Sequence, residues 1–309
     1  LPDLDGTYLA DQPLTLPSLL VLHLGNGTTI TDAANLSANP FNGDFKSFPA
    51  LVMLNGSAYS AVLGGTVNAT AHNATQMMGV GVLDGTRNAV RGVRALSNYQ
   101  AGIGVRGGLR NEIAYCDVGG DPGRVARTRA IWSLATERNY VHHNHVHHAA
   151  AHALDFDAYT ASSVAWANVC EDNLEEGIFV EETAHDNVVT GNTCRRNKNG
   201  IGVYSMAVGP VKRNMIFGNT LEANTDYQMT AGGYGHDPTK HSEGNVFFGN
   251  IAGGMPQGSA AFNVAHGANQ GDYWFGNALE SGEDAGLEFD MDTLPHDNAA
   301  VGIFQPGGE

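Results

Sequence analysis

Short segments in which apolar and polar residues alternate run through most of the chain, and Gly and Asn separate one segment from the next. Alternation of this kind predicts β-strands, whereas no apolar segment with helical spacing is long enough to form a second layer. Six segments align with one another as an internal repeat: residues 139–148, 163–180, 187–203, 214–229, 245–254 and 272–280. The second Asn of each unit forms a column with spacings of 24, 24, 27, 31 and 27 residues: Asn144, Asn168, Asn192, Asn219, Asn250 and Asn277.

The repeat predicts an all-β fold, a single-domain parallel β-helix of about ten coils. Each coil would carry about three strands and stack on the next at about 4.8 Å, giving a rod about 50 Å long. We expect each Asn of the column to adopt left-handed backbone at a bend and to bond the equivalent amide one coil along. Two inward apolar columns follow from the alignment: Val141, Ala165, Val189, Ile216, Phe247 and Trp274, and then Val146, Cys170, Cys194 and Leu221.

Three sections divide the predicted domain. Residues 1–84 are expected to form an N-terminal capping section and the first coils, residues 85–280 the β-helix core, and residues 281–309 an acidic C-terminal cap. In the core, Cys170 and Cys194 fall in one inward column on adjacent coils. Either a disulfide or a buried reduced pair is compatible with that spacing.

The repeats carry a pattern of the type GNxxxxNxxGI, present in full as GNTCRRNKNGI at residues 191–201. On this pattern the chain resembles the right-handed parallel β-helix proteins of the pectate-lyase-like superfamily, over about residues 85–280. Its repeats are most similar to those of mannuronan C5-epimerases and polysaccharide lyases. The resemblance implies a right-handed coil and an enzyme that acts on acidic polysaccharides by β-elimination, epimerisation or hydrolysis.

The stretch HHNHVHHAAAHALDFD at residues 142–157 holds six histidines and two aspartates. The repeat places His145 and His147 on one face, away from His142, so the six imidazoles are not expected to converge. Stacking puts Asp117 beside His145, and a column of alternating charge follows along the axis: His147, Glu171, Arg195 and Glu222. We therefore predict a solvent-exposed charge ladder on this face, with a transition-metal site as the alternative.

A second polar band is predicted on another face, next to the inward positions of the Gly-Ile steps. The candidate catalytic residues in it are three carboxylates, a phenol and an imidazole: Asp155, Asp157, Glu181, Tyr204 and His152. The candidate substrate-binding residues are basic or aromatic: Arg106, Trp132, His147, Arg195 and Lys198. Neighbouring carboxylates raise one another's pKa, which suits proton transfer. The alternative is that the band is the ordinary polar surface of a solenoid.

The resemblance adds an expectation for this band. The similar epimerases carry an Asp-Pro-His-Asp motif, which aligns with the sequence Asp-Phe-Asp-Ala at residues 155–158. Because only the first Asp is retained, we expect Tyr204 or His152 to supply the base or the acid. Asp155 would then stabilise the carboxylate of the substrate.

The formal net charge of −16 argues against nucleic acids and anionic membranes as partners. A polysaccharide is the partner that the resemblance implies, and a monomer is the expected state. Residues 87–213 hold 14 of the 16 basic residues and 13 acidic ones, so the bases either face an anionic ligand or balance these acids. Residues 139–194 contain nine acidic and no basic residues. Ca²⁺ is the candidate cofactor there because it binds several carboxylates, and no other cofactor is expected.

Five N-x-S/T sequons cluster in the first quarter of the chain: Asn26, Asn35, Asn55, Asn68 and Asn73. We interpret this cluster as the mark of a secreted protein that is N-glycosylated in an exposed N-terminal quarter, against the alternative of chance matches in an Asn-rich chain. No apolar run approaches the roughly 18 residues that span a bilayer, and we expect any signal peptide to have been removed.

Three functional hypotheses follow. The first is a polysaccharide lyase or uronate C5-epimerase, which abstracts the C5 proton of an acidic polymer. The second is a glycoside hydrolase that uses an Asp/Glu pair as acid and base. The third is a non-catalytic carbohydrate-binding or surface protein in which the repeat is only a stiff scaffold.

Overall fold

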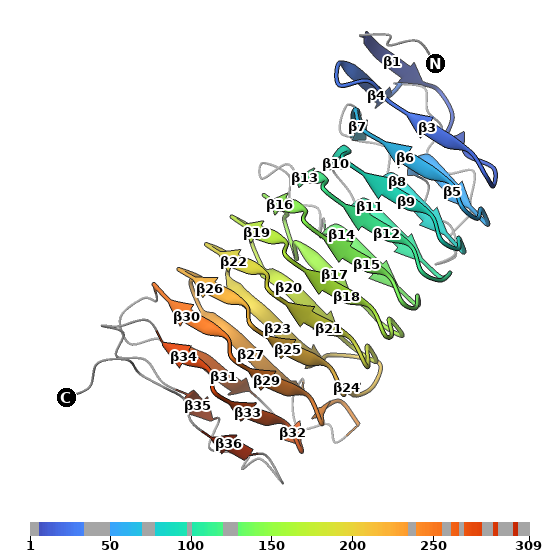
Figure 1. Cartoon of the computed structure of the whole chain (residues 1–309). Helices are drawn as coiled ribbons and strands as arrows, with labels where there is room; N and C mark the ends of the chain where they lie inside the picture. The colour runs from blue at the N-terminus through green and yellow to red at the C-terminus, as the bar shows by residue number, and fades with distance from the viewer. Residues whose placement is uncertain are drawn as a thin grey trace.

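The computed structural model describes residues 6–33, 50–69, 78–97, 101–119, 129–233, 239–254, 261–265, 269–279, 287–289 and 299–301. Within these residues the strands form a parallel β-helix of three sheets with eleven strands each, and one small sheet of three strands. The chain visits the three large sheets in turn and returns to the first one coil further along the axis (Figure 1). The predicted all-β solenoid is therefore confirmed, with eleven strands per sheet where about ten coils were expected.

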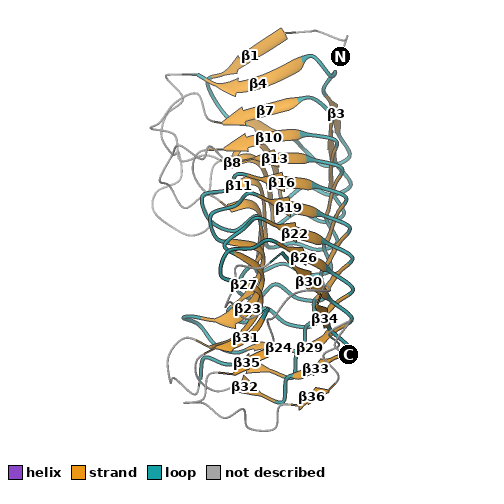
Figure 2. Cartoon of the chain, turned by 90° about the vertical axis from the view of Figure 1, so that its left-hand side faces the viewer, coloured by secondary structure: helices purple, strands orange, loops and turns teal. Residues whose placement is uncertain are grey.

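The first sheet, sheet A, faces the viewer in Figure 2, with the second sheet on its left and the third on its right. Sheet A consists of β1 (Gly6–Ala10), β4 (Thr28–Asp32), β7 (Thr66–Ala69), β10 (Arg94–Ser97), β13 (Asp117–Gly119), β16 (His145–His147), β19 (Val169–Glu171), β22 (Thr193–Arg195), β26 (Thr220–Glu222), β30 (Ile251–Gly253) and β34 (Ala278–Leu279).

The second sheet, sheet B, contains the longest strands in the middle of the helix. It consists of β2 (Leu14–Thr15), β5 (Ala50–Asn55), β8 (Met78–Leu83), β11 (Ala101–Arg106), β14 (Arg129–Leu134), β17 (Leu154–Phe156), β20 (Glu176–Glu181), β23 (Asn199–Ser205), β27 (Tyr227–Gly233), β31 (Phe262–Ala265) and β35 (Leu287–Phe289).

The third sheet, sheet C, closes the coil. It consists of β3 (Val21–His23), β6 (Ala61–Leu63), β9 (Ala89–Arg91), β12 (Glu112–Ala114), β15 (Tyr140–His142), β18 (Val164–Trp166), β21 (Val188–Thr190), β25 (Met215–Phe217), β29 (Val246–Phe248), β33 (Tyr273–Phe275) and β36 (Ala299–Val301). The small sheet consists of β24 (Val211–Lys212), β28 (Ser242–Glu243) and β32 (Asn269–Gln270).

Strands of the three large sheets occur on both sides of the predicted section boundaries. The strands β1 to β8 precede residue 85, and β35 and β36 follow residue 280. The division into residues 1–84, 85–280 and 281–309 stays a prediction.

The interior is filled by the two predicted apolar columns, which are confirmed. Val141, Ala165 and Val189 are register neighbours on successive strands of sheet C, and each is completely buried. Further along the same column, the rings of Phe247 and Trp274 stack with centroids 3.9 Å apart. In the second column, Cys170 and Cys194 are register neighbours and both are reduced and buried, so the structure has the reduced pair rather than the disulfide.

Buried Asn side chains tie adjacent coils together, as predicted. Asn192 donates from Nδ2 to the carbonyl of Ala165 at 3.0 Å and to Oδ1 of Asn219 at 3.0 Å, while its own Oδ1 accepts from Asn168. Two further ladders were not predicted. One contains Asn88, Asn111, Asn139, Ser163, Asn187, Asn214, Asn245 and Asp272, and the other contains Asn173, Asn197 and Asn224.

One detail of the Asn prediction is wrong. The residue with left-handed backbone at each bend is the one before the Asn: His143, Ala167, Gly191, Gly218, Gly249 and Gly276. The Asn side chain is buried beneath the bend, where its backbone N–H donates to the next amide of the ladder. The backbone reversal therefore falls on the preceding residue, which lies outside the ladder.

The predicted glycosylation sites lie partly within the described residues. Asn26 and Asn55 are exposed and Asn68 is half-buried, whereas Asn35 and Asn73 lie outside the described residues. Glycosylation and secretion therefore stay predictions. The described part of the chain has no helix with the length and apolar composition that crossing a bilayer requires.

Candidate active site on the outer face of sheet B

The predicted polar band lies on the outer face of four consecutive strands of sheet B, β14, β17, β20 and β23 (Figure 1). Trp132 pairs in register with Asp155, and Asp155 pairs with Phe179. Glu181 pairs with Tyr204 one coil later. The inward neighbours Leu154, Ile178 and Ile201 are completely buried, so the polar side chains between them point outward.

Arg129, which the sequence analysis did not select, holds the centre of the first cluster. Its Nε contacts Asp155 Oδ2, and its Nη2 lies 3.1 Å from Glu181 Oε1 and 3.8 Å from Asp157 Oδ2. The guanidinium carbon lies 5.5 Å from the ring centroid of Trp132, and Trp132 Nε1 donates to Asp157 Oδ2 at 2.8 Å. We call these five residues the Arg129 cluster.

The Arg129 cluster brings a positive charge from outside the stretch to the acidic residues of 139–194, for which Ca²⁺ was the candidate counterion. Arg129 lies 26 residues before Asp155 in sequence but on the adjacent coil in space. The alignment held a signal for it, because the polar position two residues before each inward Ile or Leu recurs on successive coils. That position is occupied by Arg129, His152, Glu176 and Asn199.

Burial changes the protonation of two carboxyls in the Arg129 cluster. The pKa of Asp155 is raised well above its usual value by complete burial, which the charge of Arg129 opposes and those of Glu181 and Asp157 reinforce. The pKa of Glu181 is raised to about 7, again by burial first and by the charge of Asp157 second. When both carboxyls are protonated, neither of them offsets the charge of the Arg129 guanidinium.

Asp155 differs from its predicted role because its side chain is completely buried. Its Oδ1 atom has no hydrogen-bond partner among the described residues, and its Oδ2 contacts Arg129. A side chain that solvent does not reach positions the guanidinium and does not itself meet a polymer. The more accessible members of the cluster are Arg129 and Asp157, whose side chains are 24% and 15% exposed.

The raised pKa of Glu181 predicts a pH-dependent stability. Between its usual pKa of 4.5 and about 7, the folded chain retains a proton that the unfolded chain releases, so the free energy of unfolding falls as the pH rises through this window. Glutamine at position 181 does not titrate, but its side-chain oxygen can still accept a hydrogen bond from Arg129. We therefore expect the free energy of unfolding of Glu181→Gln to fall less with rising pH, by on the order of 1–3 kcal/mol over this window. Urea unfolding at several pH values between about 5 and 8 measures it, and exposed Glu222→Gln is the control. An unchanged slope in Glu181→Gln would contradict the assignment.

The second cluster is centred on Glu176 and His152, and we call it the His152 cluster. His152 Nδ1 lies 2.6 Å from Glu176 Oε2. The other oxygen of Glu176, Oε1, accepts from Asn199 Nδ2 at 3.0 Å and from the Tyr204 hydroxyl at 3.1 Å. The Phe179 ring packs between the two proton-bearing rings, 4.5 Å from His152 and 4.7 Å from Tyr204.

Glycine at position 202 allows the Tyr204 ring to reach Glu176. A Cβ atom at Gly202 would lie 3.0 Å from Glu176 Cγ and 3.2 Å from Tyr204 Cε1, which is closer than side chains normally approach. The sequence Gly-Ile-Gly-Val-Tyr of β23 therefore places a phenol over a buried carboxylate.

In the His152 cluster the carboxyl of Glu176 loses its proton easily, whereas the phenol of Tyr204 keeps its proton. Burial alone would raise the pKa of Glu176, but its bonds with His152 and Asn199 outweigh burial and lower it to about 2. Burial and the negative charge of Glu176 raise the pKa of Tyr204 above its usual value. At neutral pH Glu176 is thus an anion that orients His152, and Tyr204 is a proton donor.

A pocket of about 320 Å³ continues from Tyr204 along the same face toward the C-terminal coils. Its polar lining comprises Lys198, Asn199, Tyr204, Asp226, Tyr227, Thr230 and Asn263. Lys198 Nζ lies 3.9 Å from Asp226 Oδ2 at the edge of this pocket. A linear ligand on the band would therefore meet Arg129 and His152 first and Lys198 further along.

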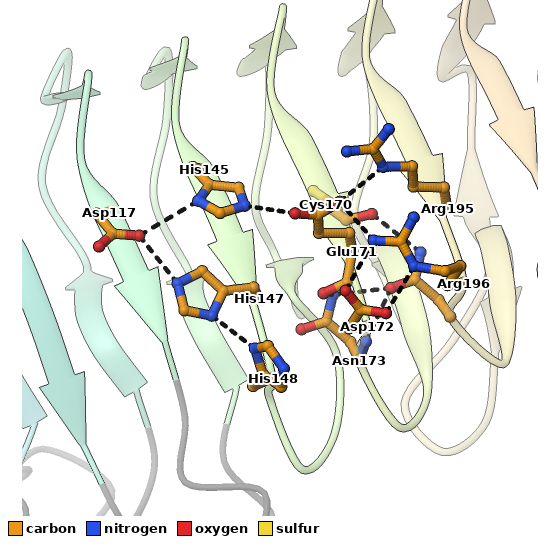
Figure 3. Close-up of polar contacts among 11 residues, drawn as sticks. Asp117, His145, His147, His148, Cys170, Glu171, Asp172, Asn173, Arg195 and Arg196 are labelled. Carbon is orange, nitrogen blue, oxygen red and sulfur yellow. Dashed lines mark hydrogen bonds and ion pairs between the residues drawn. The ribbon is translucent and has the colours of Figure 1, made fainter.

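The structure separates two of the other predicted substrate-binding residues, His147 and Arg195, from this face. His147 and Arg195 lie on sheet A in the predicted ladder, where His147, Glu171 and Arg195 are register neighbours (Figure 3). They are therefore not part of the band on sheet B. Arg106 ends β11 in register with Leu134, and its Nη1 is buried without a hydrogen-bond partner in the described residues.

Several described basic residues of the central region, Arg129 among them, pair with acids of the chain itself, which favours the charge-balancing interpretation. The ion pairs join Arg91 to Glu112, Arg94 to Asp117, Arg195 and Arg196 to Glu171, Arg213 to Asp186, and Lys198 to Asp226.

The carboxylates of Asp155, Asp157 and Glu181 offer oxygen atoms within 4.8 Å of one another. Ca²⁺ takes six to eight oxygen ligands and requires ionised carboxylates. These three residues do not fit it, because the Arg129 guanidinium contacts all three and two of the carboxyls have raised pKa values. Calcium binding stays a prediction that this cluster does not support.

Comparison with known proteins identifies the fold of the chain. Residues 78–252 match the family model described as a right handed beta helix region. A search of curated proteins finds no match.

Several solved structures share this fold at low sequence identity. The A-module of the mannuronan C-5 epimerase AlgE6 of Azotobacter vinelandii is 12% identical, with a TM-score of 0.67 over 99% of this chain and 90% of that one. The Dettilon tailspike protein is 15% identical, with a TM-score of 0.62 over 97% of this chain, which spans only 61% of the tailspike. The DFA-IIIase of Arthrobacter chlorophenolicus A6 is 10% identical, with a TM-score of 0.56 over 93% of this chain and 81% of that one.

Proposed function

Because the chain belongs to the right-handed β-helix family, we propose that it is a carbohydrate-active enzyme that abstracts the C5 proton of a uronate polymer, as a lyase or a C5-epimerase. The observation that carries the proposal is the pairing of two clusters on one face of sheet B. The His152 cluster provides an oriented imidazole and a protonated phenol, and the Arg129 cluster provides a cation beside them. The mannuronan C-5 epimerase among the similar structures supports the substrate class.

Removal of a proton next to a carboxylate requires a base on the carbon and a positive or hydrogen-bonding group on the carboxylate. His152 is the base in this proposal, because ionised Glu176 holds Nδ1 at 2.6 Å and fixes the ring. This leaves Nε2 as the nitrogen that accepts the proton. Nε2 lies 3.5 Å from exposed Glu175, so it faces the accessible side of the cluster.

Tyr204 and Arg129 complete the chemistry. The Tyr204 hydroxyl, protonated at neutral pH, donates a proton to the leaving oxygen in elimination or to the opposite face of C5 in epimerisation. Arg129, held by buried Asp155 and by Glu181, binds the carboxylate whose charge builds up as the C5 proton leaves. Trp132 and Asp157 flank the guanidinium and limit its rotation.

The proposal is tested by incubating the protein with a panel of polyuronates and recording ultraviolet absorbance, with and without Ca²⁺. Elimination creates an unsaturated uronate that absorbs, whereas epimerisation and hydrolysis do not. A rise on one polymer that is lost in Tyr204→Phe identifies a lyase and its substrate class. A flat trace on every polymer removes the lyase and leaves the epimerase, the hydrolase and the non-catalytic binder, which proton NMR and reducing-end assays then separate.

A glycoside hydrolase is the second candidate, and one observation favours it. Glu181 has a pKa of about 7, as a general acid at neutral pH requires, and an oxygen of Asp157 lies within 4.8 Å of one of its own. This separation between the two carboxyl groups is nearer to that of the catalytic pair in retaining glycosidases than in inverting glycosidases. New reducing ends without any change at C5 would support this candidate.

The remaining proposals concern the context of the protein. We propose a monomer whose partner is the polysaccharide substrate. A formal charge of −16 argues against nucleic acid and anionic membranes as partners. Secretion and N-glycosylation at exposed Asn26 and Asn55 are proposed with it, and a mass shift after glycosidase treatment of the native protein would detect the glycans. A non-catalytic binder remains the outcome if no polymer is altered.

A further inference from the structure

Three side chains of types that bind metal ions, two imidazoles and a carboxylate, lie together on the outer face of sheet A, on two adjacent coils. His145 and His147 belong to β16, and Asp117 belongs to β13, the neighbouring strand (Figure 3). We call these three residues the His145 cluster. It lies on a different sheet from β14, β20 and β23, which carry Arg129, Glu176 and Tyr204, so it has no part in the function proposed above.

The three side chains aim one atom each at a common point. His147 Nε2 lies 2.9 Å from Asp117 Oδ1, and His145 Nδ1 lies 3.4 Å from the same oxygen. The two imidazole centroids are 4.6 Å apart, and the three candidate ligand atoms all lie within 4.8 Å of one another. Ligands of a tetrahedral Zn²⁺ ion at about 2.0–2.2 Å are themselves about 3.3 Å apart, so the arrangement matches three corners of such a site.

The other nitrogen of each imidazole has its own partner, as metal-binding histidines require. His145 Nε2 lies 2.7 Å from Glu171 Oε1, which favours a proton on Nε2 and leaves the lone pair of Nδ1 toward Asp117. His147 Nδ1 lies 2.8 Å from His148 Nδ1, which allows His147 to donate from Nδ1 once a metal ion replaces the proton that Nε2 shares with Asp117 Oδ1. The second nitrogen of each ring therefore has a partner in the tautomer that metal binding needs.

Glu171 is itself fixed, so it is a firm support for His145. Its Oε2 lies 2.6 Å from Arg195 Nε and 2.8 Å from Arg196 Nη2 (Figure 3). On the opposite side, Arg94 Nε approaches Asp117 at 3.5 Å, but it does so at Oδ2 and leaves Oδ1 facing the two imidazoles. The ladder that includes His147 and Arg195 therefore also serves to orient the three ligand atoms.

The geometry points to a binding site for a divalent transition-metal ion, with Asp117 Oδ1, His145 Nδ1 and His147 Nε2 as its ligands. Two imidazoles and one carboxylate suit Zn²⁺, Co²⁺, Ni²⁺ and Cu²⁺, whereas Ca²⁺ and Mg²⁺ prefer oxygen ligands alone. The side chains of His145 and Asp117 are 48% and 43% exposed, so a fourth ligand from solvent or from a partner has access. A bound ion would join the coils of β13 and β16.

The test is a titration of the full chain, purified without a polyhistidine tag, with ZnCl₂ in a calorimeter and with CoCl₂ in a spectrophotometer. We expect one Zn²⁺ per chain, and a visible Co²⁺ band of the intensity typical of four-coordinate rather than six-coordinate ions. His147→Asn and Asp117→Asn should each abolish both signals. Glu171→Gln should weaken Zn²⁺ binding about 10- to 100-fold, because it removes the support of His145.

Two control variants separate this site from other histidines. His143→Asn alters an exposed histidine on the neighbouring bend, and His152→Gln alters the other group of imidazole and carboxylates that could hold an ion. Both should bind Zn²⁺ as the unmodified chain does. Absence of saturable binding in the unmodified chain would overturn the proposal, and so would binding that persists in His147→Asn and Asp117→Asn. Neither outcome bears on the uronate chemistry, because the two sites share no residue.

Discussion

His152→Gln is expected to lower turnover of the uronate polymer by about 10²- to 10⁴-fold, the usual contribution of a positioned general base. The amide of glutamine can donate to Glu176 but does not accept the C5 proton. Because the side chain of His152 is only 9% exposed and anchored at Nδ1, the loss should appear in kcat more than in KM. Steady-state kinetics on the polymer selected by the panel measure it, with His143→Gln as the exposed control.

A structural role for His152 predicts a different result. If the imidazole only packs against Phe179, then His152→Gln should lower the unfolding temperature while the remaining folded protein keeps its kcat. Glu176→Gln separates the cases further, because it removes the charge that orients His152 and should lower kcat while shifting its pH profile. Full activity in both folded variants would exclude His152 as the base.

Asn192→Ala is expected to destabilise the fold by on the order of 3–5 kcal/mol. The substitution deletes an acceptor for the backbone N–H and the side-chain amide of Asn168, and two donors that serve Ala165 and Asn219. All of these groups are buried, so water does not replace the lost partners. Chemical denaturation measures the change in unfolding free energy.

Exposed Asn26 provides the matched control for the ladder. Asn26→Ala should change the unfolding free energy by no more than about 0.5 kcal/mol, because surface substitutions away from such networks have little effect. A loss below about 1 kcal/mol in Asn192→Ala would mean that neighbouring coils carry the stability through apolar stacking alone.

The fold was predictable because two independent sets of positions, the Asn column and the apolar columns, recur with the same period in the sequence. A one-residue error in the alignment would have moved Val141 or Val189 to the surface, so the register followed directly from the pattern. The left-handed residue at each bend was less predictable. Glycine marks the position in four of the six coils, from Gly191 to Gly276, but Ala167 and His143 hold it in the other two, and neither type signals left-handed backbone.

The sequence was enough to predict which residues share the outer face of sheet B, but not which of them contact one another. Register alone placed Asp155, Glu181 and Tyr204 on one face, and the structure agrees. Arg129 was missed because an ion pair between coils joins residues that are about one coil apart in sequence, which a local charge count separates. Asp155 is completely buried and contacts Arg129 of the adjacent coil, and neither feature follows from residue spacing.

The central claim, abstraction of a C5 proton at the His152 cluster, is tested most directly by proton NMR of a polyuronate incubated with the protein in D₂O. The account predicts that the H5 signal of the polymer loses intensity as solvent deuterium enters, or that an alkene signal replaces it. His152→Gln should leave the spectrum unchanged. An H5 signal that keeps full intensity with the unmodified protein on every polyuronate, whether or not the polymer is shortened, would contradict the claim.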